Sequence, residues 1–399
     1  MAEEKRERVS RVQYRKKFID EKTVKELEAD GLVRCKGSVD RPFLLIVLIL
    51  VAIGTIMVFS ASYAYAKQNY SDSYFFASRQ IWWVLAGCAV MFVCTQIDYL
   101  LIRRWALYPF FWACMVLMAL VPFLGFEAGG ATRWFQIGPI NFQPSEFAKL
   151  AIIMFFSDYI AKNKRAGKGP IRQALPYLMV GIYMAVTLFL QPHISCIIII
   201  LALIFVLMIF GEVPKEVMFV LSGAAVLLVG LAILVSSHAR GRILAWLHPE
   251  DFPDVAWQPI QSLYAIGSGG VWGVGLGQST QKHLYLPEPQ NDYIFSILCE
   301  ELGFIFAIGV MALFVALIWR GIYIAKHAPS IYACLIVVGI VAQVGIQAFL
   351  NIAVVTNTIP STGIPLPFFS YGGTSLVILM AEMGMVLNIS RYSYIRKDK

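Results

Sequence analysis

Long apolar segments, separated by shorter polar ones, recur along almost the whole chain after residue 41. A helix needs about 20 mostly apolar residues to cross a bilayer. Segments of this kind lie at 43–63, 81–97, 105–125, 145–161, 174–190, 194–210, 215–236, 293–319, 331–355 and 372–390. The pattern therefore predicts about ten membrane-spanning helices. Because lipid offers no hydrogen-bond partners to exposed backbone, we expect an all-α polytopic membrane protein.

The amino-acid composition favours the same class. The chain is 58% hydrophobic and only 15% charged, whereas soluble domains are roughly 45–50% apolar and about 25% charged. Basic residues are also distributed unevenly. With the N-terminus inside, the expected inner segments hold 26 of the 33 Lys and Arg residues. Cytoplasmic loops carry this excess, so both termini are expected to be cytoplasmic. The net charge of +8 then faces anionic lipid and does not indicate nucleic-acid binding.

The composition changes abruptly near residue 41, which divides the chain into three parts. Residues 1–41 form a charged cytoplasmic tail, residues 42–391 form the transmembrane domain, and residues 392–399 form a short cytoplasmic tail. The longest expected outer loop, 237–292, joins the seventh and eighth spans. It is rich in aromatic residues, so we expect it to fold down onto the outer ends of the helices.

Several ionisable residues lie inside the predicted spans, where a charge is costly and is by default a functional candidate. Glu146 and Lys149 are three residues apart and share one face of a helix, so they can form an ion pair. Two interpretations remain open for this pair. It is either a buried link between helices, or a cavity-facing pair in which Lys149 meets an anionic ligand. Glu300 and Glu301 are further candidates, and Glu382 has no explanation from the sequence.

The glycine-rich stretch "SGGVWGVGLGQS" (268–279) lies in the long outer loop. Its backbone N–H groups could form a phosphate nest. It lacks the P-loop spacing, however, and no strand–helix context surrounds it. A close-packed re-entrant turn is therefore the favoured interpretation.

Two carboxylates stand immediately before the eighth span, in "LPEPQND" (286–292). Asp292 fits equally well as the N-cap of that span or as a catalytic group. The prolines at 287 and 289 stiffen the approach, which suits a residue that must be held in place. The residues alone leave both interpretations open, and Glu288 has no separate assignment.

Three long motifs match a known family. They are "RWFQIGPINFQPSEFAK" (133–149), "AWQPIQSLYAIGSGGVWGVGLGQSTQKHLYLPEPQNDYIFSILCEELG" (256–303) and "NTIPSTGIPLPFFSYGGTS" (357–375). From about residue 42 to the end, the chain resembles the SEDS family (shape, elongation, division, sporulation) of bacterial peptidoglycan glycosyltransferases. The stretch before the eighth span is more similar to the division and sporulation branch than to the elongation branch.

This resemblance implies that the chain polymerises lipid II into undecaprenyl-linked glycan at the outer face of the bacterial cytoplasmic membrane. It implies that Asp292 is the catalytic carboxylate and that Arg133, Glu146 and Lys149 belong to the substrate site. It also implies a class B penicillin-binding protein, a transpeptidase, as partner. One departure stands out, because His193 in "QPHISC" replaces an acidic residue of the family pattern.

The chemistry of such a reaction suggests roles for these residues. A sugar hydroxyl is a poor nucleophile, so a carboxylate such as Asp292 is needed as general base. The departing diphosphate needs positive charge, for which the outer basic residues Arg133, Arg242 and Lys282 and the membrane-edge Lys149 are the candidates. A divalent metal, Mg²⁺ or Mn²⁺, is a further expectation, with Asp292 as possible ligand and Glu288 as a residue that holds it or orients the loop.

Two other function classes stay open at this point. A lipid II flippase would place its ionisable groups near the middle of the membrane. A non-enzymatic scaffold for the penicillin-binding protein would leave the outer carboxylate and its basic neighbours without a purpose. The charges cluster at the outer ends of the spans, which favours an enzyme at the membrane surface.

Overall fold

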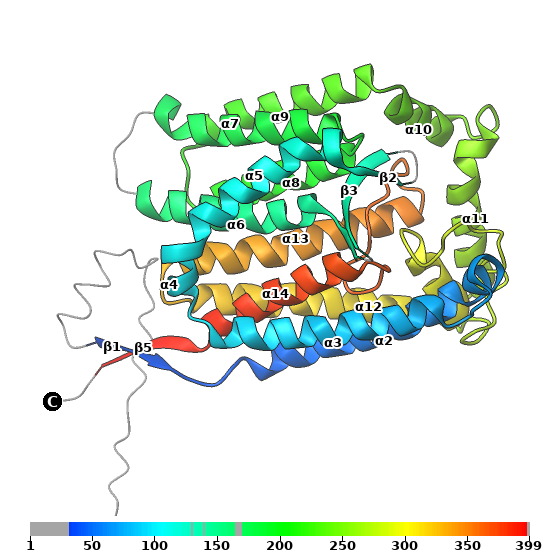
Figure 1. The fold of residues 1–399 in the computed structure, drawn as a ribbon, viewed down its shortest axis with the longest axis horizontal. Coiled ribbons are helices and arrows are strands. Elements are labelled where there is room, and N and C mark those ends of the chain that lie inside the picture. Colours follow the sequence, from blue (N-terminus) through cyan, green and yellow to red (C-terminus); the bar gives the residue numbers. More distant parts are fainter. Residues whose placement is uncertain (1–31, 129–130, 139, 164–169, 397–399) are drawn as a thin grey trace, which may run out of the picture.

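The structure is a computed structural model that describes residues 32–128, 131–138, 140–163 and 170–396. Most of residues 1–41, the expected charged tail, therefore lie outside the described residues. The helices form one elongated bundle, in which they run roughly side by side (Figure 1). Their bounds are α2 Arg41–Tyr70, α3 Phe75–Gln96, α4 Tyr99–Leu101, the π-helix η1 Ile102–Ala106, α5 Leu107–Leu124, α6 Pro144–Asn163, α7 Pro170–Phe189, α8 Ile194–Phe210, α9 Lys215–Val235, α10 Ser237–Leu247, α11 Pro253–Gly269, α12 Ile294–Lys326, α13 Ile331–Val355 and α14 Gly373–Ser390.

Seven helical segments of the described chain are long and apolar enough to cross a membrane, which confirms the polytopic class. They are Arg41–Tyr70, Phe75–Gln96, Tyr99–Leu124, Lys215–Val235, Ile294–Lys326, Ile331–Val355 and Gly373–Ser390. Two shorter apolar segments, Gln173–Phe189 and Ile194–Phe210, accompany them. Helix α6 runs in the same bundle but carries charged residues at both of its ends, among them Glu146 and Lys162.

Helix α13 lies at the centre of the bundle and α9 at its edge. Of the most apolar window of α13, 72% is buried, against 6% for α9. A helix that is apolar all round and buried on all sides requires neighbours on every face. Helix α13 has them, because α6, α8, α11, α12 and α14 all contact it.

The sequence predicted only helices, and the structure adds two small antiparallel sheets at opposite ends of the bundle (Figure 1). Strand β1 (Leu32–Lys36) pairs with β5 (Tyr392–Arg396), so the two described ends of the chain meet at one end. Strands β2 (Phe126–Ala128), β3 (Ala131–Ile137) and β4 (Ile140–Phe142) form the other sheet. Open sheet edges are tolerated there because they lie outside the predicted spans.

The expected outer loop 237–292 is folded, as the sequence predicted, and contains two helices. Helices α10 and α11 occupy the end of the bundle opposite the β1–β5 sheet (Figure 1). Trp246 of α10 donates a hydrogen bond to the carbonyl of Asn357 (2.9 Å), and Ser262 of α11 donates to the carbonyl of Val355 (2.7 Å). These bonds join the loop to the C-terminal end of α13.

Helix α12 was predicted as one continuous span, but it is broken at Gly303, whose backbone lies at φ 78° and ψ 177°. The glycine-rich segment fills the break. Val274 and Gly275 donate to the carbonyls of Glu300 and Glu301 (3.0 and 2.9 Å). In return, Phe304 and Ile305 donate to the carbonyls of Gly270 and Val271 (3.0 and 3.4 Å). The segment thus supplies the backbone hydrogen bonds that the break removes, which confirms the close-packed turn.

We expect Gly273→Ala to destabilise the protein more than Gly277→Ala. Both glycines have positive φ, 79° and 82°, but a Cβ at Gly273 would clash with the carbonyl oxygen of Glu301, whereas one at Gly277 meets nothing within 4 Å. Gly277→Ala should therefore lose about 1 kcal/mol from backbone strain alone. Gly273→Ala should lose several times as much, measured as the thermal unfolding temperature of the purified protein in detergent. Equal losses would contradict the packing described here.

Candidate active site

Asp292 lies in the chain between the glycine-rich segment and the first residue of α12, at the end of the bundle opposite the β1–β5 sheet. Helix α12 begins at Ile294 with Tyr293 as its N-cap and without a side-chain capping bond. The structure therefore does not support the capping interpretation of Asp292. Its backbone is held by Asn351 of α13, whose amide donates to the carbonyls of both Asp292 and Ile364 (2.7 Å each).

The uncharged segment 357–371 runs beside the Asp292 segment and is bonded to it. The hydroxyl of Ser370 donates to the carbonyl of Asn291 (2.7 Å), and the N–H of Tyr371 donates to the carbonyl of Gln290 (2.8 Å). Gly363 lies directly against the catalytic candidate, since a Cβ there would be 3.2 Å from Oδ2 of Asp292. The absent side chain keeps the carboxylate accessible, and Asp292 is only partly buried.

Two arginines from distant parts of the chain act electrostatically on Asp292. Arg133 comes from β3 and donates hydrogen bonds to the carbonyls of Gln191 and Pro192. Arg242 comes from α10 and donates to the carbonyl of Ser361 (3.3 Å). The positive charges of both guanidinium groups act on the carboxylate of Asp292. Because carbonyl oxygens orient each guanidinium without neutralising it, the two retain their charge for an anionic ligand.

The pKa of Asp292 is raised to about 6. Burial is the largest cause, and the negative charge of Glu288 adds to it, whereas Arg242 and Arg133 act in the opposite direction. Within the described part of the chain, the carboxylate takes no hydrogen bond. A carboxylate with a pKa of about 6 is ionised at neutral pH and is a stronger base than an ordinary aspartate.

His193 lies in the same region and is buried, with 8% of its surface exposed. Burial, together with the charges of Arg133, Lys149 and Arg242, holds its pKa well below the usual value for histidine. Its Nδ1 atom has no hydrogen-bond partner among the described residues. At neutral pH His193 is therefore uncharged, and it adds neither a carboxylate nor a third cation to the site.

Glu146 and Lys149 form the predicted ion pair, with 2.7 Å between Oε1 and Nζ. Lys149 is only 1% exposed, and the charge of Glu382 also acts on it. Glu382, which the sequence left unexplained, accepts two hydrogen bonds from Gln343 (3.1 and 3.0 Å). Glu146 and Gln343 also line a small cavity of about 30 Å³ under the 365–370 segment. The pair is thus a buried ion pair, and Glu146 but not Lys149 borders the cavity. Contact of Lys149 with an anionic ligand stays a prediction.

Lys282 does not lie with Arg133 and Arg242. It is 3% exposed and pairs with Glu301 of α12 (2.8 Å), to which Ser60 of α2 also donates (2.7 and 2.6 Å). Next to it, Glu300 accepts hydrogen bonds from the N–H groups of Thr280 and Gln281 (2.8 and 3.3 Å). This cluster fastens the glycine-rich segment to α2 and α12. A role of Lys282 in substrate binding stays a prediction.

Glu288 is exposed at the surface near Asp292. It accepts hydrogen bonds from Asn291 (2.8 Å) and from the hydroxyl of Tyr65 (3.4 Å). The backbone of Glu288 has a positive φ of 45°, an unusual conformation for a residue with a side chain. Its proposed function as a metal ligand or loop-orienting residue stays a prediction.

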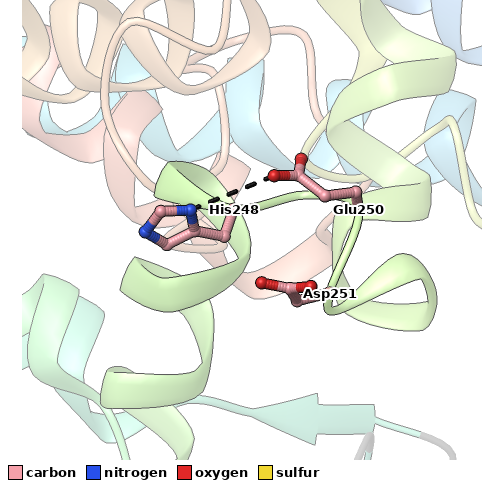
Figure 2. A group of neighbouring side chains, drawn as sticks. All are labelled: His248, Glu250 and Asp251. Atoms are coloured by element: carbon pink, nitrogen blue, oxygen red, sulfur yellow. Dashed lines mark ion pairs between the residues drawn. The ribbon is translucent and has the colours of Figure 1, made fainter.

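A separate group of possible metal ligands lies at the turn between α10 and α11. Figure 2 shows His248, Glu250 and Asp251 gathered there, with one ligand atom of each within 4.8 Å of the others. Nδ1 of His248 lies 4.0 Å from Oε1 of Glu250, and all three side chains are exposed. Exposed acidic groups of this kind are common without a metal. This group does not include Asp292 or Glu288, the residues for which a metal was predicted.

The sequence did not single out Asn351, although it fixes the backbone of Asp292. Its signal was an amide inside an apolar span, where a polar side chain must find partners. Ser361 and Gly363 carried no comparable signal, because their positions depend on how the 357–371 segment folds.

Comparison with known proteins places the chain in a family. Residues 40–395 match the family model of FtsW, RodA and SpoVE, described as a cell cycle protein. The chain is 41% identical over 365 residues to stage V sporulation protein E of Bacillus subtilis, covering 90% of this chain and 98% of that protein. It is 38% identical to a probable peptidoglycan glycosyltransferase FtsW of Trichlorobacter lovleyi, covering 88% and 93%. The chain therefore belongs to the FtsW, RodA and SpoVE family.

Solved structures agree with this placement. A chain from a peptidoglycan synthase complex that coordinates polymerization and crosslinking superposes with a TM-score of 0.71 at 25% identity, covering 88% of this chain and 98% of that chain. The rod shape determining protein RodA of Thermus thermophilus gives a TM-score of 0.66 at 25% identity, covering 88% and 97%.

The two interpretations of Lys282 predict different results for Lys282→Met. Removing one partner of a buried ion pair leaves an uncompensated charge, so the variant should lose about 3–5 kcal/mol of stability. The double variant Lys282→Met/Glu301→Leu should recover part of that loss. Thermal unfolding in detergent measures both effects. An unchanged unfolding temperature with a raised KM for lipid II would instead support the substrate-binding role.

Proposed function

We propose that this chain polymerises lipid II into glycan strands, with Asp292 as the general base. The observation that carries the proposal is a partly accessible carboxylate with a raised pKa, on which two arginines act electrostatically. Among the described residues, these arginines donate hydrogen bonds to carbonyl oxygens and form no ion pair with a carboxylate. Membership of the family, with relatives named as probable peptidoglycan glycosyltransferases, makes the chain an enzyme of that class acting in cell division or sporulation.

The proposed setting is the bacterial cytoplasmic membrane, crossed ten times. With α6, α7 and α8 added to the seven long apolar segments, the proposed spans number ten. The excess of basic residues supports a cytoplasmic position for the end that carries the β1–β5 sheet. Asp292 and both arginines then lie at the outer face, where the sugar of a lipid-anchored substrate is found.

The reaction requires a proton acceptor beside the attacking hydroxyl. In the proposed step, Asp292 takes the proton of the 4-hydroxyl of the acceptor sugar as that oxygen bonds to the anomeric carbon of the donor. The bond between that carbon and the diphosphate oxygen breaks, and its electron pair leaves with undecaprenyl diphosphate. A base of pKa about 6 remains ionised at neutral pH and so is ready for each cycle.

Arg133 and Arg242 are placed to bind the diphosphate. Their charges stabilise the negative charge that develops on the leaving group. Lys149 is less suited to direct contact, because it is almost fully buried and already paired with Glu146. We assign the Glu146–Lys149 pair to the support of the cavity beneath the 365–370 segment.

A divalent ion fits this site as a proposed cofactor. Mg²⁺ is commonly held by one or two carboxylates together with substrate phosphates. The carboxylate of Asp292 accepts no hydrogen bond from the described residues, so both of its oxygens are available as ligands. Bound there by Asp292 and the diphosphate, Mg²⁺ or Mn²⁺ would add Lewis-acid stabilisation of the leaving group.

The proposed partner is a class B penicillin-binding protein that crosslinks the new strands. The solved complex with which the chain superposes coordinates polymerization and crosslinking, which supports a transpeptidase partner for this chain. Lipid II and membrane lipid are the other proposed partners.

Asp292→Ala and Asp292→Asn should abolish polymerisation, by about 10²-fold or more in rate, because the base is removed. The assay mixes the purified protein, its transpeptidase, lipid II and Mg²⁺ or Mn²⁺, and resolves glycan chains on a gel. Glu288→Gln is compared in the same assay, and a loss of activity that excess Mg²⁺ restores would support the predicted metal-holding role of Glu288. Normal chains from Asp292→Ala would refute the mechanism, and a chelator arm tests the metal.

The rate should fall as pH falls through about 6, because protonated Asp292 cannot accept a proton. Arg242 lowers the pKa of Asp292, so Arg242→Gln should move the midpoint upward by about 1 unit in addition to any loss of rate. The pH dependence of kcat/KM for wild type and variant measures the shift. A midpoint that stays in place, or moves downward, would show that Asp292 does not control the acid limb.

A further inference from the structure

A row of aromatic rings leads from the surface of the protein to the Asp292 segment. Tyr70 stacks on Phe75, with ring centroids 3.8 Å apart and planes at 12°. Phe75 and Tyr70 both contact Phe76, at 5.2 and 5.5 Å. Phe76 meets Tyr371 edge-on at 4.9 Å. The N–H of Tyr371 donates to the carbonyl of Gln290, two residues before Asp292. The row is therefore connected to the catalytic segment by direct contacts.

A cation completes the outer part of this row. The guanidinium carbon of Arg79 lies 3.9 Å from the centroid of Phe75. A ring and a guanidinium that both lie within 4 Å of one centroid must cover opposite faces, so Phe75 is sandwiched between Tyr70 and Arg79. Tyr70 keeps 48% of its surface exposed, and Arg79 is also exposed. The stack Tyr70–Phe75–Arg79 thus presents an aromatic surface and a cation to the outside.

The stack lies beyond the hydrocarbon core, so contact with lipid tails does not explain its exposed ring. Helix α2 has 30 residues and is about 45 Å long, whereas the hydrocarbon core is about 30 Å thick. The charged residue Arg41 begins α2 at the opposite membrane surface. The last turns of α2 therefore extend beyond the hydrocarbon core. Tyr70 is the last residue of α2, and polar residues follow it in the turn "SDS" (71–73). An exposed ring there faces the layer in which headgroup sugars lie.

We propose that the Tyr70–Phe75–Arg79 stack is a binding site for the sugar chain, outside the catalytic pocket. Sugar rings have an apolar face of C–H groups that packs on an aromatic ring, while their hydroxyl groups remain hydrogen-bonded. Arg79 matches the carboxylates that a peptide-bearing glycan carries. The inference rests on the proposed function and deepens it, because a polymerase must hold the strand between successive additions.

The test compares chain lengths made by wild type, Tyr70→Ala and Arg79→Gln from limiting lipid II. Tyr70→Ala should make chains at a near-normal initial rate, but the chains should be several-fold shorter, because the strand is released earlier. Arg79→Gln should also shorten the chains, and because Arg79 is hydrogen-bonded to Tyr371, its effect on the initial rate is measured separately. Tyr70→Phe keeps the ring and should restore wild-type lengths. Tyr74→Ala is the matched control, since Tyr74 is 62% exposed and stacks on Phe59 at 5.5 Å in the same hairpin rather than on Phe75.

A binding measurement separates the sugar chain from other ligands. A soluble, lipid-free glycan tetrasaccharide is titrated into the wild-type protein in nanodiscs by calorimetry. Tyr70→Ala should weaken binding roughly three- to tenfold, the range that aromatic stacking contributes. Unaltered binding of the tetrasaccharide by Tyr70→Ala would overturn the inference. If, in addition, the variant changes chain length only when the transpeptidase is present, the stack is a protein-binding surface instead.

The remaining outcomes also decide the question. Equal shortening by Tyr70→Ala and Tyr74→Ala would show that the aromatic residues only anchor the hairpin at the membrane surface, and would overturn the inference. Unchanged lengths in every variant would do the same while leaving the proposed function intact. If wild type makes no chains at all, the proposed function fails, and the inference fails with it.

Discussion

The break in α12 makes a demand that the surrounding structure must meet. At Gly303 the helix leaves its regular path, and the carbonyls of Glu300 and Glu301 lose their usual donors. Unpaired backbone groups inside a membrane bundle cost several kcal/mol each. The 270–275 segment meets this demand by donating to those carbonyls and accepting from Phe304 and Ile305. The half-helix that follows Asp292 is thereby held at a fixed position on the bundle.

The presence or absence of a side-chain partner distinguishes Asp292 from Glu301, Glu146 and Glu382. Glu301 is paired with Lys282, Glu146 with Lys149, and Glu382 is held by Gln343. Each carboxylate has a partner because an unpaired charge in such surroundings is expensive. In the part of the chain that the structure describes, the carboxylate of Asp292 accepts no hydrogen bond. Arg133 and Arg242 act on this carboxylate through their charge. The carboxylate oxygens are therefore available to accept a proton.

Much of the fold followed from hydrophobic pattern and charge. Span positions, the folded outer loop and the Glu146–Lys149 pair depend on local spacing, which the sequence displays directly. The break at Gly303 was missed because an apolar run looks the same whether its helix is continuous or interrupted. The partner of Lys282 was missed for a related reason. Glu301 was visible as a buried charge, but its distance from Lys282 depends on the path of the glycine-rich segment.

The arrangement around Asp292 depends on contacts between distant segments, which no local pattern encodes. Arg133 is oriented by carbonyls at 191–192 and Arg242 by the carbonyl of Ser361, while Asn351 joins the Asp292 and Ile364 backbones. The family resemblance points to Asp292 and Arg133 as site residues, but it does not show what holds them in place. Because carbonyl oxygens rather than carboxylates orient the arginines, their positive charge is retained. In the proposed mechanism, this charge is available to an anionic diphosphate at the point where Asp292 would receive the proton.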